Sequence, residues 1–576
     1  MGDNENRKVY KARQVKNYRE MVEYSCKNYA QNIAYKYKKD YTAKNVEYIE
    51  KTYEQVGKDI KAFGTGLLNL DLMGERIVVV GKNRYEWCIS YLATTCSNMV
   101  IVPIDKALPD IEMQRLIERS EAKAIIFDEK YLETIKKVQE KENSNLKTLI
   151  CMDNIQEKGI KTFNEILEEG RNQIKNGDKK YDNIEIDENN LSIMLFTSGT
   201  TNEPKAVMLS QANICANISN IACWVKLYPT DVLLSFLPIH HTFESTITFL
   251  YGFYSGSQVA FCDGLKHIQQ NLKEYKVSVF VAVPLVLETM YKKIQKAIEE
   301  QGKTGLINKM TKISNTLLKA KIDIRKIVFK QILDNFGGHL RVVLYGAAPM
   351  NKATIIGYNN LGISLVQGYG LTETSPVVTA ETDKEKRPGS IGLALANLNL
   401  KIANPDNEGV GEITVKGPSV MLGYYKNPEE TKKVLKDGWF STGDYGYKDK
   451  DGFVYITGRK KDIIVLKNGK NVYPQEIEFL INKIPYIAES LVYSRDKDTT
   501  DTMLCAKIVY DKDAIKQMIG EKTEEEYKEI IWQEIKKINQ ELPIFKKIKN
   551  ITITTEPLKK TTTQKVKRYE ELKNLT

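Results

Sequence analysis

Short apolar runs alternate with helical segments from residue 77 to about Pro388. Residues 77–80 read Ile-Val-Val-Val, a continuous pattern that is typical of a strand covered on both faces of a sheet. This alternation predicts α/β layers built on parallel sheets. The other runs of this kind are residues 100–103, 124–127, 148–152, 193–196, 232–237, 259–262, 279–283, 342–344 and 365–367.

The pattern changes after Pro388. Hairpin-like strands are predicted at residues 398–403, 412–416 and 453–457, and Asn, Asp and Gly turns separate them. These strands indicate a small antiparallel barrel or sheet.

A new α/β segment begins after Gly-Arg-Lys-Lys at residues 458–461, and it includes a long helix near residues 524–540. A chain of 576 residues is too long for one hydrophobic core. We therefore expect two domains, residues 1–458 and residues 459–576.

Residues 195–208 read Leu-Phe-Thr-Ser-Gly-Thr-Thr-Asn-Glu-Pro-Lys-Ala-Val-Met and follow a predicted strand. Hydroxyls and main-chain N–H groups in a turn after a strand converge on anionic oxygens, and a glycine lets the main chain approach them. Pro204 precedes Lys205, so this is not the common P-loop. A Ser/Thr-rich surface loop is the alternative. The candidate phosphate-binding residues are Thr197, Ser198, Gly199, Thr200, Thr201 and Lys205.

Two later predicted strands run into glycine-rich turns, Tyr-Gly-Ala-Ala-Pro at residues 345–349 and Gly-Tyr-Gly-Leu-Thr-Glu-Thr at 368–374. Open α/β sheets place ligands at such carboxyl ends of strands. A carboxylate such as Glu373 near a triphosphate suits Mg²⁺, which prefers oxygen ligands shared with phosphates. The alternative is that Glu373 only stabilises the start of a helix, where the helix dipole favours a negative charge.

These motifs, in this order, resemble those of the adenylate-forming (AMP-binding) superfamily, which includes acyl-CoA synthetases, luciferases and adenylation domains of peptide synthetases. The resemblance covers nearly the whole chain, and several stretches look most like bacterial long-chain fatty acid–CoA ligases. The matching motifs are the phosphate loop, Leu-Pro-x-x-His at 237–241, Tyr-Gly-x-Thr-Glu at 369–373, Gly-Trp-Phe-Ser-Thr-Gly-Asp at 438–444, Gly-Arg-Lys-Lys-Asp at 458–462 and Thr-Thr-Thr-x-Lys-Val-Lys-Arg at 561–568.

The resemblance implies a large N-terminal domain of α/β subdomains with a small β-barrel, followed by a small mobile α/β domain. It also implies roles for individual residues. Lys565, Glu373 and His241 would be catalytic, and Thr197 and Glu373 would hold Mg²⁺. Lys461 would be the hinge between the domains, and Gly469 would flank CoA. The further ATP- or AMP-binding residues would be Gly346, Ala347, Ala348, Tyr369, Gly370, Thr372, Asp444 and Arg459.

The implied reaction is ATP-dependent activation of a long-chain fatty acid to acyl-CoA through an acyl-adenylate, with Mg²⁺ as cofactor and release of AMP and pyrophosphate. One alternative is an acyl-AMP ligase that loads a carrier protein, and another is a non-catalytic lipid- or nucleotide-binding protein. The sequence departs from the family's motifs at two positions, and both would affect the rate of this reaction. Asn202 and Gln564 stand where the family usually has glycine. The acyl chain would enter a tunnel near residues 243–254 and 283–290.

Composition narrows the cellular setting. The net charge of +11 mildly favours anionic ligands, but no dense basic arm indicates nucleic-acid binding. The eight cysteines form no Cys-x-x-Cys pair and are expected to be buried free thiols. No apolar run approaches the ~20 residues of a membrane span, and the N-terminus lacks a signal-peptide pattern. We expect a cytoplasmic protein with peripheral membrane contact left open. No amphipathic anchor is evident, and residues 299–330 read as a pair of solvated helices.

Overall fold

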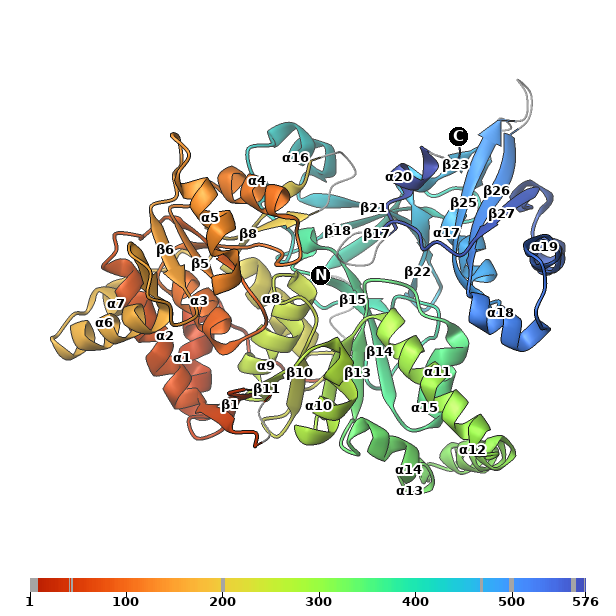
Figure 1. Cartoon of the computed structure of the whole chain (residues 1–576), viewed down its shortest axis with the longest axis horizontal. Coiled ribbons are helices and arrows are strands. Elements are labelled where there is room, and N and C mark those ends of the chain that lie inside the picture. Colours follow the sequence, from red (N-terminus) through yellow and green to blue (C-terminus); the bar gives the residue numbers. More distant parts are fainter. Residues whose placement is uncertain are drawn as a thin grey trace. The chain divides into compact units, whose positions relative to one another are not determined.

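The computed structural model describes residues 9–40, 42, 45–197, 203–466, 470–496, 502–560, 566–573 and 575. The chain divides into two compact units. The first unit is Met1–Leu400 with Val415–Phe440, and the second is Lys401–Thr414 with Ser441–Thr576 (Figure 1). The division expected at residue 458, where a new α/β segment begins in the sequence, stays a prediction.

An eight-stranded sheet organises the N-terminal half of the first unit, in the order β19-β9-β8-β4-β3-β5-β6-β7. Strands β3 to β7 pair in parallel, as does β4 with β8. The last four residues of β3 are fully buried, which confirms the strand predicted to be covered on both faces. The strands are β3 (Arg76–Val80), β4 (Val100–Pro103), β5 (Ala124–Phe127), β6 (Thr148–Cys151), β7 (Ile160–Thr162), β8 (Leu191–Thr197), β9 (Lys205–Ser210) and β19 (Gly423–Tyr424).

Strand β9, which the sequence analysis did not predict, runs antiparallel to β8, so this sheet is not wholly parallel. Seven residues connect the two strands, and a parallel pair needs a crossover of a dozen or more. The short strand β19 then pairs antiparallel with β9, with Tyr424 opposite Val207. The edge of this sheet therefore brings residues near 205 next to residues near 424.

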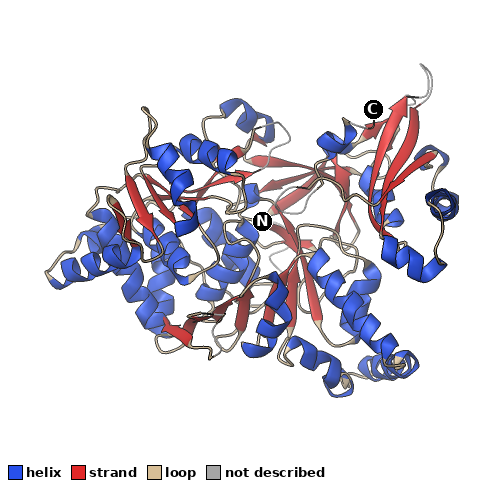
Figure 2. Cartoon of the chain, in the orientation of Figure 1, coloured by secondary structure: helices blue, strands red, loops and turns tan. Residues whose placement is uncertain are grey.

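A nine-stranded sheet forms the rest of the first unit, in the order β16-β15-β14-β13-β12-β10-β11-β1-β2. Its central strands are parallel and its outer pairs are antiparallel. Figure 2 shows helices packed around both sheets. The strands are β1 (Ile33–Lys38), β2 (Tyr48–Thr52), β10 (Val232–Ser235), β11 (Gln258–Phe261), β12 (Val279–Ala282), β13 (Val342–Tyr345), β14 (Ser364–Gly370), β15 (Val377–Ala380) and β16 (Leu393–Ala394).

Three helices of the first unit, α2, α6 and α8, begin at capping boxes. Thr52 and Gln55 form a capping box at the start of α2, and Ser210 and Asn213 form one at α8. The helices are α1 (Tyr18–Asn28), α2 (Tyr53–Leu68), α3 (Tyr85–Cys96), α4 (Asp110–Ser120), η2 (Glu129–Tyr131), α5 (Leu132–Gln139), α6 (Phe163–Lys175), α7 (Lys180–Asn183), α8 (Gln211–Ala222), η3 (Glu244–Leu250), α9 (Tyr251–Tyr254), η4 (Leu265–His267), α10 (Ile268–Glu274), α11 (Pro284–Glu300), α12 (Thr304–Lys319), α13 (Arg325–Val328), α14 (Lys330–Leu333), η5 (Asp334–Phe336), α15 (Lys352–Asn360), η6 (Thr372–Thr374) and α16 (Pro428–Val434).

The antiparallel strands predicted after Pro388 form a five-stranded sheet, in which β17-β18-β21-β20 is the strand order and β22 pairs with β21. The C-terminal segment adds the pair β23-β24 and a three-stranded sheet, β25-β26-β27, with a core that includes Ile477, Ile531 and Ile551. The long helix predicted near 524–540 is α19. The elements are β17 (Asn399–Ala403), β18 (Gly411–Lys416), β20 (Leu435–Lys436), β21 (Trp439–Lys448), β22 (Val454–Arg459), η7 (Lys460–Asp462), β23 (Ile464–Val465), β24 (Asn471–Val472), α17 (Pro474–Ile481), β25 (Ile487–Asp496), β26 (Thr502–Tyr510), α18 (Lys512–Ile519), α19 (Glu524–Glu541), η8 (Ile544–Lys546), β27 (Asn550–Thr554) and α20 (Arg568–Leu572).

All eight cysteines are free, and six of them are buried. Among the described residues, no helix is long and apolar enough to cross a membrane.

Helices α2 and α6 pack with their main chains in contact at Gly170. A β-carbon at this glycine would lie 1.8 Å from the Ala62 carbonyl oxygen. We predict that Gly170→Ala lowers the free energy of unfolding by about 3 kcal/mol, because the two helices must separate. Gly305→Ala is the matched control, since Gly305 is also helical and a β-carbon there meets nothing within 4 Å. The control should be neutral or stabilising by about 0.5–1 kcal/mol. Urea unfolding measures both, and equal effects would contradict this packing.

Candidate active site

The predicted phosphate loop connects the antiparallel strands β8 and β9. Thr197 and Lys205 face each other in the strand register, and the Thr197 hydroxyl donates to the Lys205 carbonyl oxygen at 3.4 Å. The loop therefore leaves and re-enters the sheet at one point. The predicted residues Ser198, Gly199, Thr200 and Thr201, and the departure Asn202, lie outside the described residues.

The Lys205 ammonium is paired with a carboxylate that the sequence analysis did not single out. Its Nζ lies 2.6 Å from Oε2 of Glu430, which is in the first turn of α16. Hydrogen bonds from Lys205 and Lys433 lower the pKa of the Glu430 carboxyl to about 2. Glu430 is therefore ionised at neutral pH, and an anionic ligand must compete with it for Lys205.

Tyr424 contacts both Lys205 and Glu373. The Lys205 Nζ lies 5.0 Å from the centre of the Tyr424 ring, a cation–π distance. The Tyr424 hydroxyl donates to Glu373 Oε1 at 3.0 Å. Burial, with the nearby Glu373 charge, raises the pKa of the Tyr424 hydroxyl well above its usual range, so it remains a donor. Lys205, the predicted phosphate-binding cation, and Glu373, the predicted Mg²⁺ ligand, therefore both contact Tyr424.

The sequence analysis assigned no role to Tyr424. The available signal was its place in the stretch Val-Lys-Gly-Pro-Ser-Val-Met-Leu-Gly-Tyr-Tyr, residues 415–425, which is one of the stretches that resemble fatty acid–CoA ligases. Pairing of β19 with β9 explains why this distant tyrosine reaches the strand that carries Lys205.

Glu373 lies in the short helix η6, and the main chain around it is held from several sides. Its carbonyl oxygen accepts a hydrogen bond from the Met421 N–H at 2.9 Å. A β-carbon at Gly370 would lie 1.9 Å from the Pro376 carbonyl oxygen, so a glycine is required there. Asn217 of α8 pairs with both main-chain groups of Val377, at 2.7 and 3.2 Å. Thr372 and Tyr369, also predicted site residues, are half-buried in this segment.

The predicted ATP- or AMP-binding residues Gly346, Ala347 and Ala348 follow β13. Gly346 is buried, whereas the two alanines are exposed. Ala347 has φ of +71°, the left-handed region that L-residues other than glycine rarely adopt. A β-carbon at Gly346 would lie 2.7 Å from the Gly368 carbonyl oxygen and 3.8 Å from the Phe243 ring. Three segments predicted separately, near residues 243, 346 and 368, therefore lie together in the first unit.

His241 is half-buried, and its Nδ1 accepts a hydrogen bond from the Phe243 N–H at 3.2 Å. In a neutral ring this bond places the proton on Nε2, which is then a donor. His240 differs from it. Its Nε2 lies 3.7 Å from Asp105, and burial lowers the pKa of this imidazole.

A buried carboxyl group lies just beyond this histidine. Glu244 is fully buried at the start of the π-helix η3, and it accepts hydrogen bonds from Ser235 at 2.7 Å and Thr248 at 2.9 Å. Burial raises the pKa of the Glu244 carboxyl to about 8, although these hydrogen bonds oppose the shift. The sequence analysis missed Glu244, whose burial depends on long-range packing.

The second unit holds another part of the predicted set. Asp444 of β21 is opposite Arg459 of β22, and the Arg459 Nε lies 2.7 Å from Asp444 Oδ1. Asp444 is buried, whereas Arg459 remains partly exposed. Two of the predicted ATP- or AMP-binding residues are therefore cross-strand neighbours. Lys461 is exposed in η7, next to Lys460, which pairs with Glu412 at 2.7 Å.

Gly469, Gln564 and Lys565 lie outside the described residues. The residues on either side of 561–565 are described. Lys560 and Val566 form an antiparallel bridge, and the Lys567 N–H donates to the Lys559 carbonyl oxygen at 2.8 Å.

Arg568 fixes the chain after this bridge. Its guanidinium donates to Glu478 Oε1 and to the Val492 carbonyl oxygen, each at 2.6 Å. The Val492 N–H donates to the same Glu478 oxygen. The end of the predicted C-terminal motif is thus anchored in the core of the second unit.

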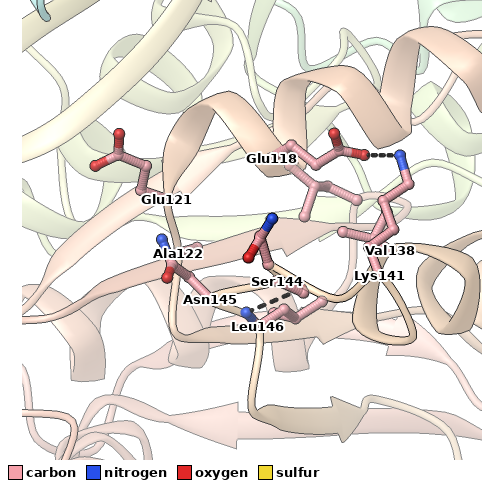
Figure 3. Close-up of a pocket in the computed structure, with 10 residues that line it drawn as sticks. Glu118, Glu121, Ala122, Val138, Lys141, Ser144, Asn145 and Leu146 are labelled. Carbon is pink, nitrogen blue, oxygen red and sulfur yellow. Dashed lines mark hydrogen bonds and ion pairs between the residues drawn. The ribbon is translucent and has the colours of Figure 1, made fainter.

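The described residues contain no group of three or more His, Cys, Asp or Glu that could hold a metal ion. A pocket of about 150 Å³ lies between the end of α4 and the segment before β6 (Figure 3). Lys141 pairs with Glu118 at its rim, and the Leu146 N–H donates to the Ser144 hydroxyl at 3.2 Å. It contains none of the predicted site residues and is not part of the candidate site.

Two family models match the chain. The AMP-binding enzyme model matches residues 22–425, and the AMP-binding enzyme C-terminal domain model matches residues 461–575. The chain belongs to the AMP-binding enzyme family. This membership and the α/β architecture confirm the predicted family and fold class.

Named relatives are similar over most of their length. The chain is 30% identical to long-chain-fatty-acid–CoA ligase 6 of Mus musculus, over 81% of this chain and 70% of that protein. It is 28% identical to the chloroplastic long-chain-fatty-acid–[acyl-carrier-protein] ligase AEE15 of Arabidopsis thaliana, over 85% and 76%. The fold is similar to the crystal structure of ATP-bound MatB from Rhodopseudomonas palustris, with a TM-score of 0.74, 23% identity and coverage of 97% and 99%.

The Glu244 carboxyl supplies a pH-dependent prediction. Its folded-state pKa of about 8 lies above the ordinary value of 4.5, so the folded protein keeps a proton that the unfolded chain releases. This group's contribution to the free energy of unfolding therefore falls as pH rises from 4.5 to about 8. We therefore expect the free energy of unfolding of Glu244→Gln, relative to that of the wild type, to increase by about 2 kcal/mol when the pH is raised from about 5.5 to about 7.5. Urea unfolding at both values measures this, and a difference that does not change with pH would show that the carboxyl titrates normally.

Proposed function

We propose that this enzyme activates a long-chain fatty acid in two steps. The fatty carboxylate attacks the α-phosphorus of ATP, the bond to pyrophosphate breaks, and an acyl-adenylate forms. The thiol of CoA then attacks the acyl carbon, AMP leaves, and a thioester forms. The observation that carries the proposal is the shared contact of Lys205 and Glu373 with Tyr424, on a chain whose relatives include fatty acid–CoA ligases.

The residues of the first unit would bind the triphosphate and the acyl carboxylate. Lys205 and the hydroxyl of Thr197 suit phosphate oxygens, and Glu373 with those oxygens suits Mg²⁺, which neutralises charge that develops on the leaving pyrophosphate. The Nε2–H of His241 is a donor suited to the acyl carboxylate. No side-chain nucleophile is needed, because the adenylate itself carries the activation.

The residues of the second unit would bind the ribose and switch between the steps. A buried carboxylate such as Asp444, held by Arg459, can accept two hydrogen bonds from a ribose diol. We infer that Lys565 bridges the carboxylate and α-phosphate in the first step. Movement about Lys461 would then remove Lys565 and bring Gly469 beside pantetheine. A cytoplasmic location, with peripheral membrane contact, belongs to this proposal.

A second candidate is an acyl-AMP ligase that passes the acyl group to a carrier protein. The similarity to the acyl-carrier-protein ligase of Arabidopsis thaliana favours it. Both candidates share the first step, so only the acceptor distinguishes them. Product formation with free CoA, or only with acyl carrier protein, separates the two.

Pyrophosphate release from MgATP tests the proposed function. We expect release that depends on the fatty acid and rises with chain length toward long chains. Lys565→Ala should lower the rate by about 10³-fold, because a cation that stabilises transition-state charge is removed. Acyl-CoA should form only when CoA is added. If ATP binds but no fatty acid of any length supports release, the catalytic proposal is wrong.

Tyr424, the last residue of β19, and the adjacent Tyr425 offer a matched test of the site. Tyr424→Phe keeps the ring beside Lys205 but removes the donor to Glu373, and we expect about tenfold slower pyrophosphate release. Tyr425→Phe removes a hydroxyl that donates to Glu121 at 2.9 Å, and it should keep the wild-type rate. Equal rates for the two variants would remove Tyr424 from the site.

A further inference from the structure

The positive charge of the chain is concentrated in one surface segment. Residues 301–330 contain eight Lys or Arg residues and one acidic residue, Asp323. This segment therefore carries a net charge of +7, of a total of +11 for the chain. It comprises α12 and α13 with their connections, and Figure 1 shows both helices at the periphery of the first unit.

Helix α12 is amphipathic, with an apolar edge that remains exposed. Leu306 is 51% exposed and Ile313 is 48% exposed, and seven residues, or two helical turns, separate them. Lys309 lies between them on the same side of the helix, because residues three and four apart are surface neighbours. The opposite side faces the unit: Ser314 is buried, and Asn315 donates to Asn360 of α15 at 2.9 Å.

The exposed apolar surface includes the last turn of α12 and continues past its end into α13. Leu318 is 37% exposed, Ile322 is 53% exposed and Ile327 is 78% exposed. Asp323, the one acidic residue, is paired with Arg325, so it does not offset the lysines of α12. Within the part of the chain that the structure describes, Lys309, Lys312 and Lys319 form no ion pairs.

We propose that α12 and residues 320–327 form a docking surface for a lipid bilayer with anionic headgroups. A helix with lysines beside an exposed Leu and Ile edge can bury that edge at the headgroup boundary while the lysines pair with anionic lipids. A single-stranded nucleic acid is a weaker match, because its binding surfaces combine basic residues with aromatic side chains that stack on the bases, whereas residues 301–328 contain no aromatic residue. Duplex DNA would contact the lysines through its phosphates but leave the exposed Leu and Ile edge without a role. An acidic protein would use the lysines but leave the isolated apolar side chains without a role.

This surface revises the expectation that residues 299–330 are only solvated. Helices α12 and α13 lie in this range, but the sequence pattern did not reveal which apolar residues of α12 stay uncovered. The use of the surface rests on the proposed function, because a long-chain fatty acid partitions into bilayers and a docked enzyme would be near its substrate. Binding to vesicles can be measured without ATP, CoA or fatty acid, so it can fail or succeed independently of catalysis.

Flotation of the full-length protein with vesicles tests the proposal. The vesicles contain phosphatidylcholine alone or with about 30% phosphatidylglycerol. We expect binding to the anionic vesicles that weakens as salt is raised. The triple variant Lys309→Gln, Lys312→Gln, Lys319→Gln should bind about 100-fold more weakly, at about fivefold for each lysine. The double variant Leu306→Ser, Ile313→Ser should lose about tenfold or more.

Matched controls remove similar groups elsewhere. Lys528→Gln, Lys536→Gln, Lys537→Gln removes three exposed lysines from α19, and Ile111→Ser removes an apolar side chain of α4 that is 79% exposed. Both controls should bind like the wild type, and every variant should keep wild-type pyrophosphate release with detergent-dispersed fatty acid. The proposal is overturned if the α12 variants bind like the controls, or if neutral and anionic vesicles bind equally. It is also overturned if duplex DNA competes for the surface as well as anionic vesicles do.

Discussion

The pairing of Lys205 with Glu430 and Tyr424 is the interaction on which the arrangement of the first unit's site depends. The Lys205 side chain is largely buried. Removing an ammonium group from water without giving it a partner costs about several kcal/mol, because its charge loses its hydration. Glu430 offsets that charge, and the Tyr424 ring covers it. Because β19 adds to β9, the strand that presents the lysine also fixes the tyrosine that binds Glu373. Residues near 205, 373 and 424–430 are thus one structural assembly.

The two units build their predicted residues by different means. In the first unit, tight main-chain contacts at Gly346 and Gly370 bring strand ends together and leave little freedom to the turns that follow. In the second, Asp444 and Arg459 meet as a cross-strand pair, and Arg568 anchors the chain after residue 566 to Glu478 and Val492. The site residues of each unit are therefore held by contacts within that unit. This suits the proposed mechanism, in which the second unit moves between the two steps.

The sequence predicted the features that depend on neighbouring residues, namely buried strands and the turns that end them. Continuous apolar runs identified strands such as β3, and glycine-rich turns marked strand ends at residues 346 and 370. The antiparallel direction of β9 could have been inferred from the seven-residue connection, but its partner β19 could not, because two residues more than 200 positions away carry no periodic signal. Tyr424 and Glu430 were missed for that reason. Glu244 was missed because burial of a carboxyl depends on tertiary packing, and the exposed edge of α12 because a hydrophobic pattern does not say which face is covered.

The central claim is that the Lys205, Tyr424 and Glu373 assembly serves the formation of an acyl-adenylate. A single-turnover experiment with enzyme in excess over α-labelled ATP, with Mg²⁺ and a long-chain fatty acid but no CoA, tests it most directly. We predict that the label appears in acyl-AMP, that adding CoA converts this species to AMP and acyl-CoA, and that Glu373→Gln slows the first conversion more than the second. Cleavage of ATP to ADP and phosphate, or no labelled adenylate at any fatty acid concentration, would contradict the account.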